Sequence, residues 1–139
     1  MRNGVTLIEL AVVLVVIGVL CAIGFPGILR FLDRSHVRHA TNELVTVLAL
    51  ARTTSVARGV HVTTRFDAVR GSVAVIAGGD TILSRDLGVV HGVSIRSNRD
   101  STVYGPTGLG YGAANQTIVV QRGRALDSII VSRLGRVRR

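Results

Sequence analysis

A run of about 20 residues without a charged side chain, from Leu10 to Leu29, constrains this chain more than any other feature. At about 1.5 Å of rise per residue, such a run forms a helix of roughly 30 Å, which matches the hydrocarbon core of a bilayer. One carboxylate, Glu9, stands immediately before the run. An acidic group beside a membrane span costs free energy unless a cation pairs with it. The pattern therefore predicts a membrane-spanning helix with a functional acid, Glu9, at its start.

Three other kinds of apolar N-terminal segment fit the run less well. A plain signal anchor would not need Glu9. A secretory signal peptide would have a shorter apolar region and more basic residues before it than Arg2 alone. A lipoprotein site at Cys21 is disfavoured because the bulky Leu20 precedes the cysteine.

The length, the cysteine count and the charge of the chain limit what the rest of the molecule can be. A chain of 139 residues has room for one membrane segment and one small domain. The single cysteine excludes an intramolecular disulfide. The formal net charge is +9, and every basic residue apart from histidine is arginine. A chain this basic fits acidic partners such as lipid head groups, nucleic acid or acidic neighbours in an assembly.

Apolar residues recur at three- and four-residue steps from Leu29 to about Ala57, with polar residues between them. This spacing predicts an amphipathic helix that continues the span, with Leu44 and Leu48 on the face to be buried. Pro26 should kink or loosen the helix where it leaves the membrane.

Beyond Gly59 the apolar period changes from 3.6 to 2, which is typical of strands. We expect turns at 67–71 and 78–80, a glycine-rich loop at 105–112, and strands at 60–66, 72–77, 81–85, 89–95, 116–122 and 128–132. The predicted fold is α+β, with a long N-terminal transmembrane and amphipathic helix packed on a small antiparallel β-sheet domain.

Two stretches of the sequence resemble a known family. Gly4 followed by Val-Thr-Leu-Ile-Glu-Leu and an apolar run resembles the start of a type IV pilin-like prepilin, with Val5 in place of the usual phenylalanine. The C-terminal half resembles the GspH/FimT group, which includes minor pilins and type II secretion pseudopilins. The matching segments are 104–108, 115–118 and 130–138, while 60–100 carries no motif of the group.

The resemblance implies a processing route and a structural role. Prepilin peptidase would cleave between Gly4 and Val5, and the new Val5 amine would be N-methylated. Glu9, then the fifth mature residue, would be the assembly carboxylate. The chain would lie in the inner membrane as a single-pass protein with its C-terminal domain outside the cytoplasm. It would then join other pilin or pseudopilin subunits in a periplasmic or surface filament.

The expected organisation follows from the span and the resemblance together. It comprises a leader peptide at 1–4, a transmembrane helix at 5–29, an amphipathic continuation at 30–58 and a β-rich GspH/FimT-like domain at 59–139. The arginines just past the span, Arg30, Arg34 and Arg38, would by charge bias alone keep the domain in the cytoplasm. The prepilin motif is more specific and implies the opposite orientation.

No pattern of catalytic or cofactor-binding residues is recognisable, so we expect neither an enzyme nor a cofactor site. His36 and His39 share a helix face, but no cysteine or carboxylate pair completes a zinc site beside them. The glycine-rich loop lacks the Gly-Lys-Ser/Thr of a phosphate-binding P-loop. We therefore expect a turn between strands there.

The basic C-terminus is the remaining candidate site. The planar guanidinium group of arginine can bind phosphate oxygens through two parallel hydrogen bonds. In addition, Gly-Arg-Val-Arg at 135–138 resembles the tail of DNA-binding minor pilins that act in natural transformation. The candidate ligands for double-stranded DNA are Arg124, Arg133, Arg136, Arg138 and Arg139. No aromatic residues alternate with these arginines, so binding would be driven by phosphate contacts and independent of sequence. There are two alternatives to DNA binding: the tail is simply solvated, or it contacts an acidic neighbouring subunit.

Overall fold

The structure is a computed structural model that describes residues 6–112 and 115–139. Among these residues, helix α1, Leu7–Arg58, comes first, followed by three strands, the short helix α2, Leu87–His91, and six further strands. The residues divide into two compact units, which separate between Leu32 and Asp33.

The first unit contains the apolar part of α1. This helix is long and apolar enough to cross a membrane, by its length and composition. Its apolar side chains are exposed in the isolated chain, among them Leu14, Ile17 and Leu20. The helix continues through Pro26 without a break, so the kink expected there does not interrupt it.

The second unit begins with the amphipathic part of α1. The residues that it buries recur at helical spacing, as the sequence predicts: Val37, Ala40, Thr41, Leu44, Val47, Leu48, Ala51 and Ser55. Because the apolar residues stand three or four positions apart, they form one stripe that packs against the strands.

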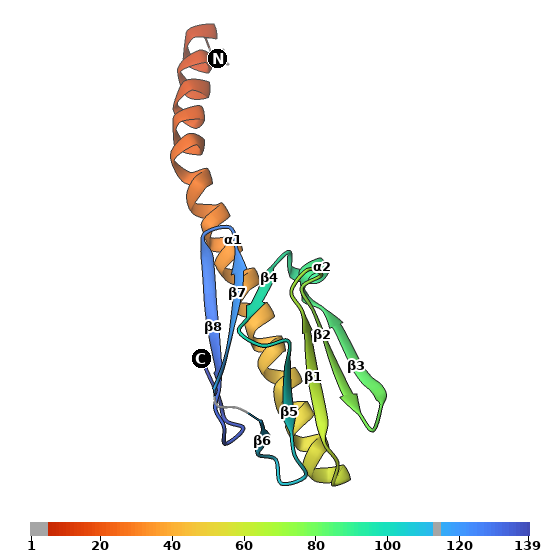
Figure 1. The fold of residues 1–139 in the computed structure, drawn as a ribbon. Coiled ribbons are helices and arrows are strands. Elements are labelled where there is room, and N and C mark those ends of the chain that lie inside the picture. Colours follow the sequence, from red (N-terminus) through yellow and green to blue (C-terminus); the bar gives the residue numbers. More distant parts are fainter. Residues whose placement is uncertain (1–5, 113–114) are drawn as a thin grey trace. The chain divides into compact units, whose positions relative to one another are not determined.

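Two antiparallel sheets cover this stripe, where the sequence had suggested one small sheet (Figure 1). The first has the order β3-β2-β1-β5-β6 and the second the order β4-β7-β8-β9. The strands of the first sheet are β1 Val62–Asp67, β2 Ser72–Ala77, β3 Asp80–Asp86, β5 Ser101–Tyr104 and β6 Gly110–Tyr111. Those of the second are β4 Ser94–Ser97, β7 Gln116–Arg122, β8 Ala125–Val131 and β9 Val137–Arg138.

One hydrophobic core joins the helix to both sheets. It contains Leu44 and Leu48 of α1, Val75 of the first sheet and Ile118 and Ile129 of the second. The long helix packed against antiparallel sheets confirms the predicted α+β class.

The strand expected at 89–95 was wrong for residues 89–93. Residues Leu87–His91 form α2, because Asp86 caps the helix by accepting a hydrogen bond from the Val89 backbone N–H at 3.0 Å. Gly92 ends it with a left-handed backbone at φ 63°. Strand β4 begins only at Ser94.

Candidate functional site

Glu9 lies in the first turn of α1 and is exposed. Its backbone N–H donates to the Thr6 hydroxyl at 3.3 Å, which satisfies one of the free donors at the helix start. Within residues 6–112 and 115–139, no side chain forms a hydrogen bond or ion pair with the Glu9 carboxylate. The predicted cleavage residues Gly4 and Val5 lie outside the described residues.

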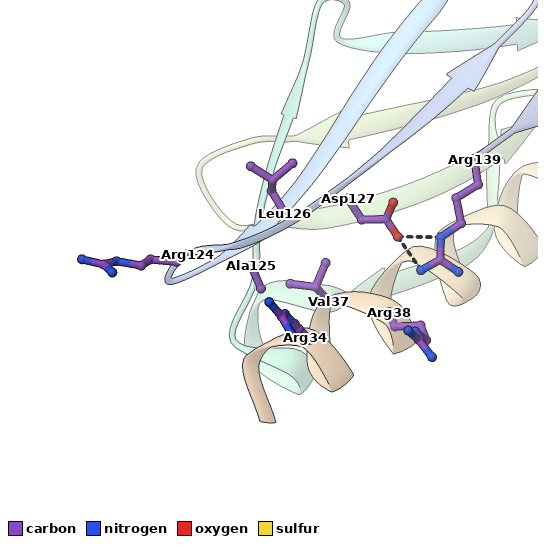
Figure 2. Close-up of a pocket in the computed structure, with 8 residues that line it drawn as sticks. All are labelled: Arg34, Val37, Arg38, Arg124, Ala125, Leu126, Asp127 and Arg139. Atoms are coloured by element: carbon purple, nitrogen blue, oxygen red, sulfur yellow. Dashed lines mark hydrogen bonds and ion pairs between the residues drawn. The ribbon is translucent and has the colours of Figure 1, made fainter. Parts of the chain in front are cut away.

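A hollow of about 420 Å³ in the second unit gathers arginines from distant parts of the sequence. Arg34 and Arg38 stand one helical turn apart on α1, and Arg124 lies in the turn between β7 and β8. Figure 2 shows Arg34 beside Ala125 of the β7–β8 hairpin and Arg38 one turn further along the helix, with Arg124 extending away from both. We call this site the arginine hollow; its lining is Arg34, Val37, Arg38, Arg124, Ala125, Leu126, Asp127 and Arg139.

The charges of the arginine hollow are unevenly paired. Arg139 donates from Nε to Asp127 Oδ2 at 2.6 Å and from a terminal nitrogen to Asn42 Oδ1 at 3.1 Å, so its charge is neutralised locally. In the part of the chain that the structure describes, no hydrogen bond or ion pair engages the guanidinium groups of the other three. Arg34, Arg38 and Arg124 therefore leave the hollow with a local excess of positive charge.

An ion pair beside the hollow fixes the hairpin against the helix. Arg122, at the end of β7, donates from Nε to Asp33 Oδ1 at 3.0 Å. A terminal nitrogen of the same guanidinium also donates to the His91 backbone carbonyl. These contacts hold the β7–β8 turn, and with it Arg124, next to the start of the second unit.

The remaining arginines of the predicted DNA site lie elsewhere. Arg133 lines a second, smaller hollow of about 160 Å³ together with Tyr111 and Gln116. Arg136 and Arg138 are exposed, and the Arg136 backbone N–H donates to Ser132 Oγ at 3.2 Å. The five predicted arginines thus divide between two hollows and an exposed tail.

The glycine of the Gly-Arg-Val-Arg segment has a packing role. Gly135 adopts φ 72°, and a Cβ there would lie 2.6 Å from the Gly108 carbonyl oxygen and 3.3 Å from the Tyr104 ring. Tyr104 is fully buried, and this burial raises the pKa of its hydroxyl to about 12, although the nearby Arg52 opposes the shift. The glycine therefore joins the C-terminal tail to the glycine-rich loop.

The histidines form no recognisable metal site within the described ranges. His91 Nε2 lies 2.9 Å from Glu43 Oε2, and Arg85 approaches the same carboxylate at 3.4 Å. The ring of His36 meets that of His91 edge-on at 6.4 Å, whereas His39 is exposed. Glu43 thus joins α1 to β3 and α2.

Sequence reasoning missed the contribution of Arg34 and Arg38 to a site. Both were considered only as polar residues between the apolar positions of the helix and as part of the charge bias past the span. Their four-residue spacing puts them side by side on one face. That spacing could have indicated a pair, but not the hairpin opposite.

Comparisons with known proteins agree with this geometry. A family model described as type II transport protein GspH matches residues 40–135. A model of the prokaryotic N-terminal methylation motif matches residues 1–25. No curated protein matches the sequence at a significant level.

Two crystal structures of the type IV minor pilin FimU from Pseudomonas aeruginosa (strain PAO1) are similar to this chain. The form in space group P21 gives a TM-score of 0.65 at 16% identity, over 78% of this chain and 90% of that chain. The form in space group P65 gives 0.60 at 14% identity, over 73% and 90%. At such identities the likeness establishes a shared fold.

Proposed function

This chain belongs to the GspH family of pilin-like proteins, and from that premise we propose that it is a structural subunit of a type II secretion pseudopilus or a type IV pilus. Its N-terminal methylation motif implies processing by a prepilin peptidase and assembly with other pilin-like subunits. We propose that the subunit has no catalytic activity. It would be anchored in the inner membrane by residues 5–29, with residues 59–139 outside the cytoplasm.

The observation that carries the proposal is the exposed apolar part of α1 with a single acid at its start. The apolar side chains of this part are exposed in the isolated chain, so they require lipid or neighbouring subunits around them. The Glu9 carboxylate has no partner within the described residues, and a neighbour's N-terminal amine would supply one. In low dielectric this pairing is strong, which favours packing of one span against another.

Processing is tested by intact-mass measurement of protein extracted from the membranes of its own host. We expect cleavage between Gly4 and Val5, with a methyl group on the Val5 amine. A mature chain that starts after Ala22, or one that retains Met1 in a host with active peptidase, would contradict the proposal.

Assembly is tested with Glu9→Leu. This variant should insert in the membrane at least as well as the wild type, because a desolvation cost disappears. It should nevertheless enter filaments poorly, which is measured as the subunit's ratio to the major subunit in sheared filaments. Asp80→Asn is the matched control, because Asp80 is an exposed carboxylate of the second unit. Incorporation of Glu9→Leu at the wild-type level would refute the pairing.

A second candidate function is DNA binding by the C-terminal tail, which the exposure of Arg133, Arg136 and Arg138 supports. The Asp127 pairing of Arg139 makes that residue a weaker DNA ligand than the sequence suggested. Glycine at 135 sets the path of the tail, which leaves the two following arginines exposed.

The DNA hypothesis is tested by anisotropy titration of the detergent-solubilised full chain with duplex DNA at several salt concentrations. If about four phosphates are neutralised, log K should fall against log salt with a slope of roughly −3 to −4. Arg136→Gln with Arg138→Gln should flatten the slope by about two. Equal binding by the wild type and the double variant would assign the tail to subunit contacts instead.

A further inference from the structure

We propose that the arginine hollow binds the phosphate group of an anionic phospholipid, with Arg34, Arg38 and Arg124 as its ligands. This site differs from the DNA-binding tail and from Glu9, and neither the family match nor the structural likeness assigns it. The inference rests on unpaired charge, the shape of the hollow and its position in the chain.

The unpaired charge indicates an anion. Three arginines line one hollow, and no acid among the described residues pairs with any of their guanidinium groups. The carboxylate in the lining, Asp127, is already engaged by Arg139 at 2.6 Å. Like charges close together repel one another, and a bound anion relieves that repulsion. Guanidinium forks match phosphate oxygens and can bind them through two parallel hydrogen bonds.

The shape favours a single head group over a nucleic acid. A volume of about 420 Å³ lies within the range of small-molecule sites, roughly 300–1,000 Å³. Duplex DNA presents a charge for about every 1.7 Å of its axis, and it is best met by arginines spread along a surface. Here the arginines border one concavity.

The position in the chain keeps Arg34 close to the predicted span. Arg34 follows Leu29, the end of the apolar run, by five residues. Even a fully extended chain would hold their Cα atoms within about 18 Å, so this limit applies however the two units are oriented. Basic residues this close to a span are attracted to anionic lipids. The lipid surface is therefore the most concentrated local source of phosphate groups.

The test is native mass spectrometry of the full chain in detergent micelles, titrated with phosphatidylglycerol or with phosphatidylethanolamine of the same acyl chains. We expect the wild type to retain phosphatidylglycerol in preference to the zwitterionic lipid. Arg34→Gln, Arg38→Gln and Arg124→Gln combined should weaken that retention by at least about tenfold, given roughly 1 kcal/mol for each arginine near a lipid surface.

The matched control combines Arg133→Gln, Arg136→Gln and Arg138→Gln, which removes the same charge outside the hollow. This control should weaken lipid retention by less than about twofold. Circular dichroism checks that both triple variants are folded. If the first is not, the double variant Arg34→Gln with Arg38→Gln takes its place, since both side chains are exposed.

Four outcomes would overturn the proposal. The wild type could retain both lipids equally, or both triple variants could lose phosphatidylglycerol equally, in which case diffuse charge rather than the hollow governs retention. Inorganic phosphate added to the titration could abolish the retention of phosphatidylglycerol by the wild type, which would make the site one for a free anion. The hollow variant could lose DNA binding and keep the lipid, which would assign the site to nucleic acid.

Discussion

The two parts of helix α1 differ in where their partners lie. Leu14, in the first unit, is 62% exposed, whereas Leu44, in the second, is fully buried against the strands. The second part has a narrow apolar stripe because its partner is the chain itself and covers one face only. The first part is apolar on all sides, so its surroundings must be apolar on all sides too. The width of an apolar face thus indicates whether a helix is covered by its own chain or from outside.

The largest expected effect comes from shortening a leucine in each part. Leu44→Ala should lower the free energy of unfolding of the second unit by about 2–5 kcal/mol, because it removes buried contacts and leaves a cavity. Leu14→Ala should change the same quantity by less than about 0.5 kcal/mol. Chemical denaturation in detergent, followed by near-ultraviolet circular dichroism, measures both.

This comparison fails if the two substitutions cost the same. Equal losses would mean that the apolar part of α1 contributes to the folding of the second unit. The difference in burial between Leu14 and Leu44 would then not predict how much each residue contributes to the stability of the second unit.

A smaller effect is expected from glycines. Gly135→Ala should cost about 2–4 kcal/mol, because it combines a left-handed backbone with a Cβ only 2.6 Å from the Gly108 carbonyl oxygen. Gly79 has a positive φ of 95° but open space around it, so Gly79→Ala should measure the backbone strain alone, which costs about 1 kcal/mol of stability. Gly24→Ala, in the apolar part of α1, should cost nothing. Thermal unfolding of the three variants ranks them, and equal midpoints for the first two would show that the tail does not pack on the glycine-rich loop.

The smallest effect at neutral pH is expected at Tyr104. Its buried hydroxyl has no hydrogen-bond partner among the described residues, so Tyr104→Phe should change stability by less than about 1 kcal/mol at pH 7. The pKa is raised to about 12 from 10 in the unfolded chain, so the folded state holds the proton more tightly. The contribution of the protonated Tyr104 to stability should therefore be fully present below pH 10 and should be lost as the pH rises toward 12.

The same substitution tests that pH dependence. Between pH 10 and pH 12, Tyr104→Phe should lose less stability than the wild type, because it has no buried phenol to ionise. Ultraviolet titration of phenolate absorbance should show that the ionisation step near pH 12 disappears in this variant. Parallel stability curves would contradict the burial of an ionisable Tyr104.

Local patterns predicted the parts of the fold that depend on neighbouring residues. The strand at 72–77 and that at 116–122 were predicted with the observed bounds, because their alternation is uninterrupted and turn residues flank them. The segment at 89–95 failed because valines favour strands, while the decisive signal was the Asp86 cap. Val89 and Val90 are 80% and 66% exposed, so no packing compensates for their weak helix preference.

Non-local pairing set the limit of sequence reasoning. Strand β5 is short and pairs with β1, from which it is distant in sequence. The division into two sheets follows from such pairings, which alternation cannot reveal. The candidate site shows the same limit. Glu9 was found because it adjoins the span, whereas Arg34 and Arg124 form a site only once the hairpin packs on the helix.

The ion pair between Asp33 and Arg122 has a consequence for the timing of synthesis, because its partners are 89 residues apart in sequence. At about 5–20 residues per second, a ribosome needs roughly 5–20 s to make the chain between them. Throughout that interval the amphipathic part of α1 has no second sheet to cover it, and Arg34 and Arg38 have no opposite wall. A nascent chain would thus present Arg34 and Arg38 beside its span before the β7–β8 hairpin completes the arginine hollow.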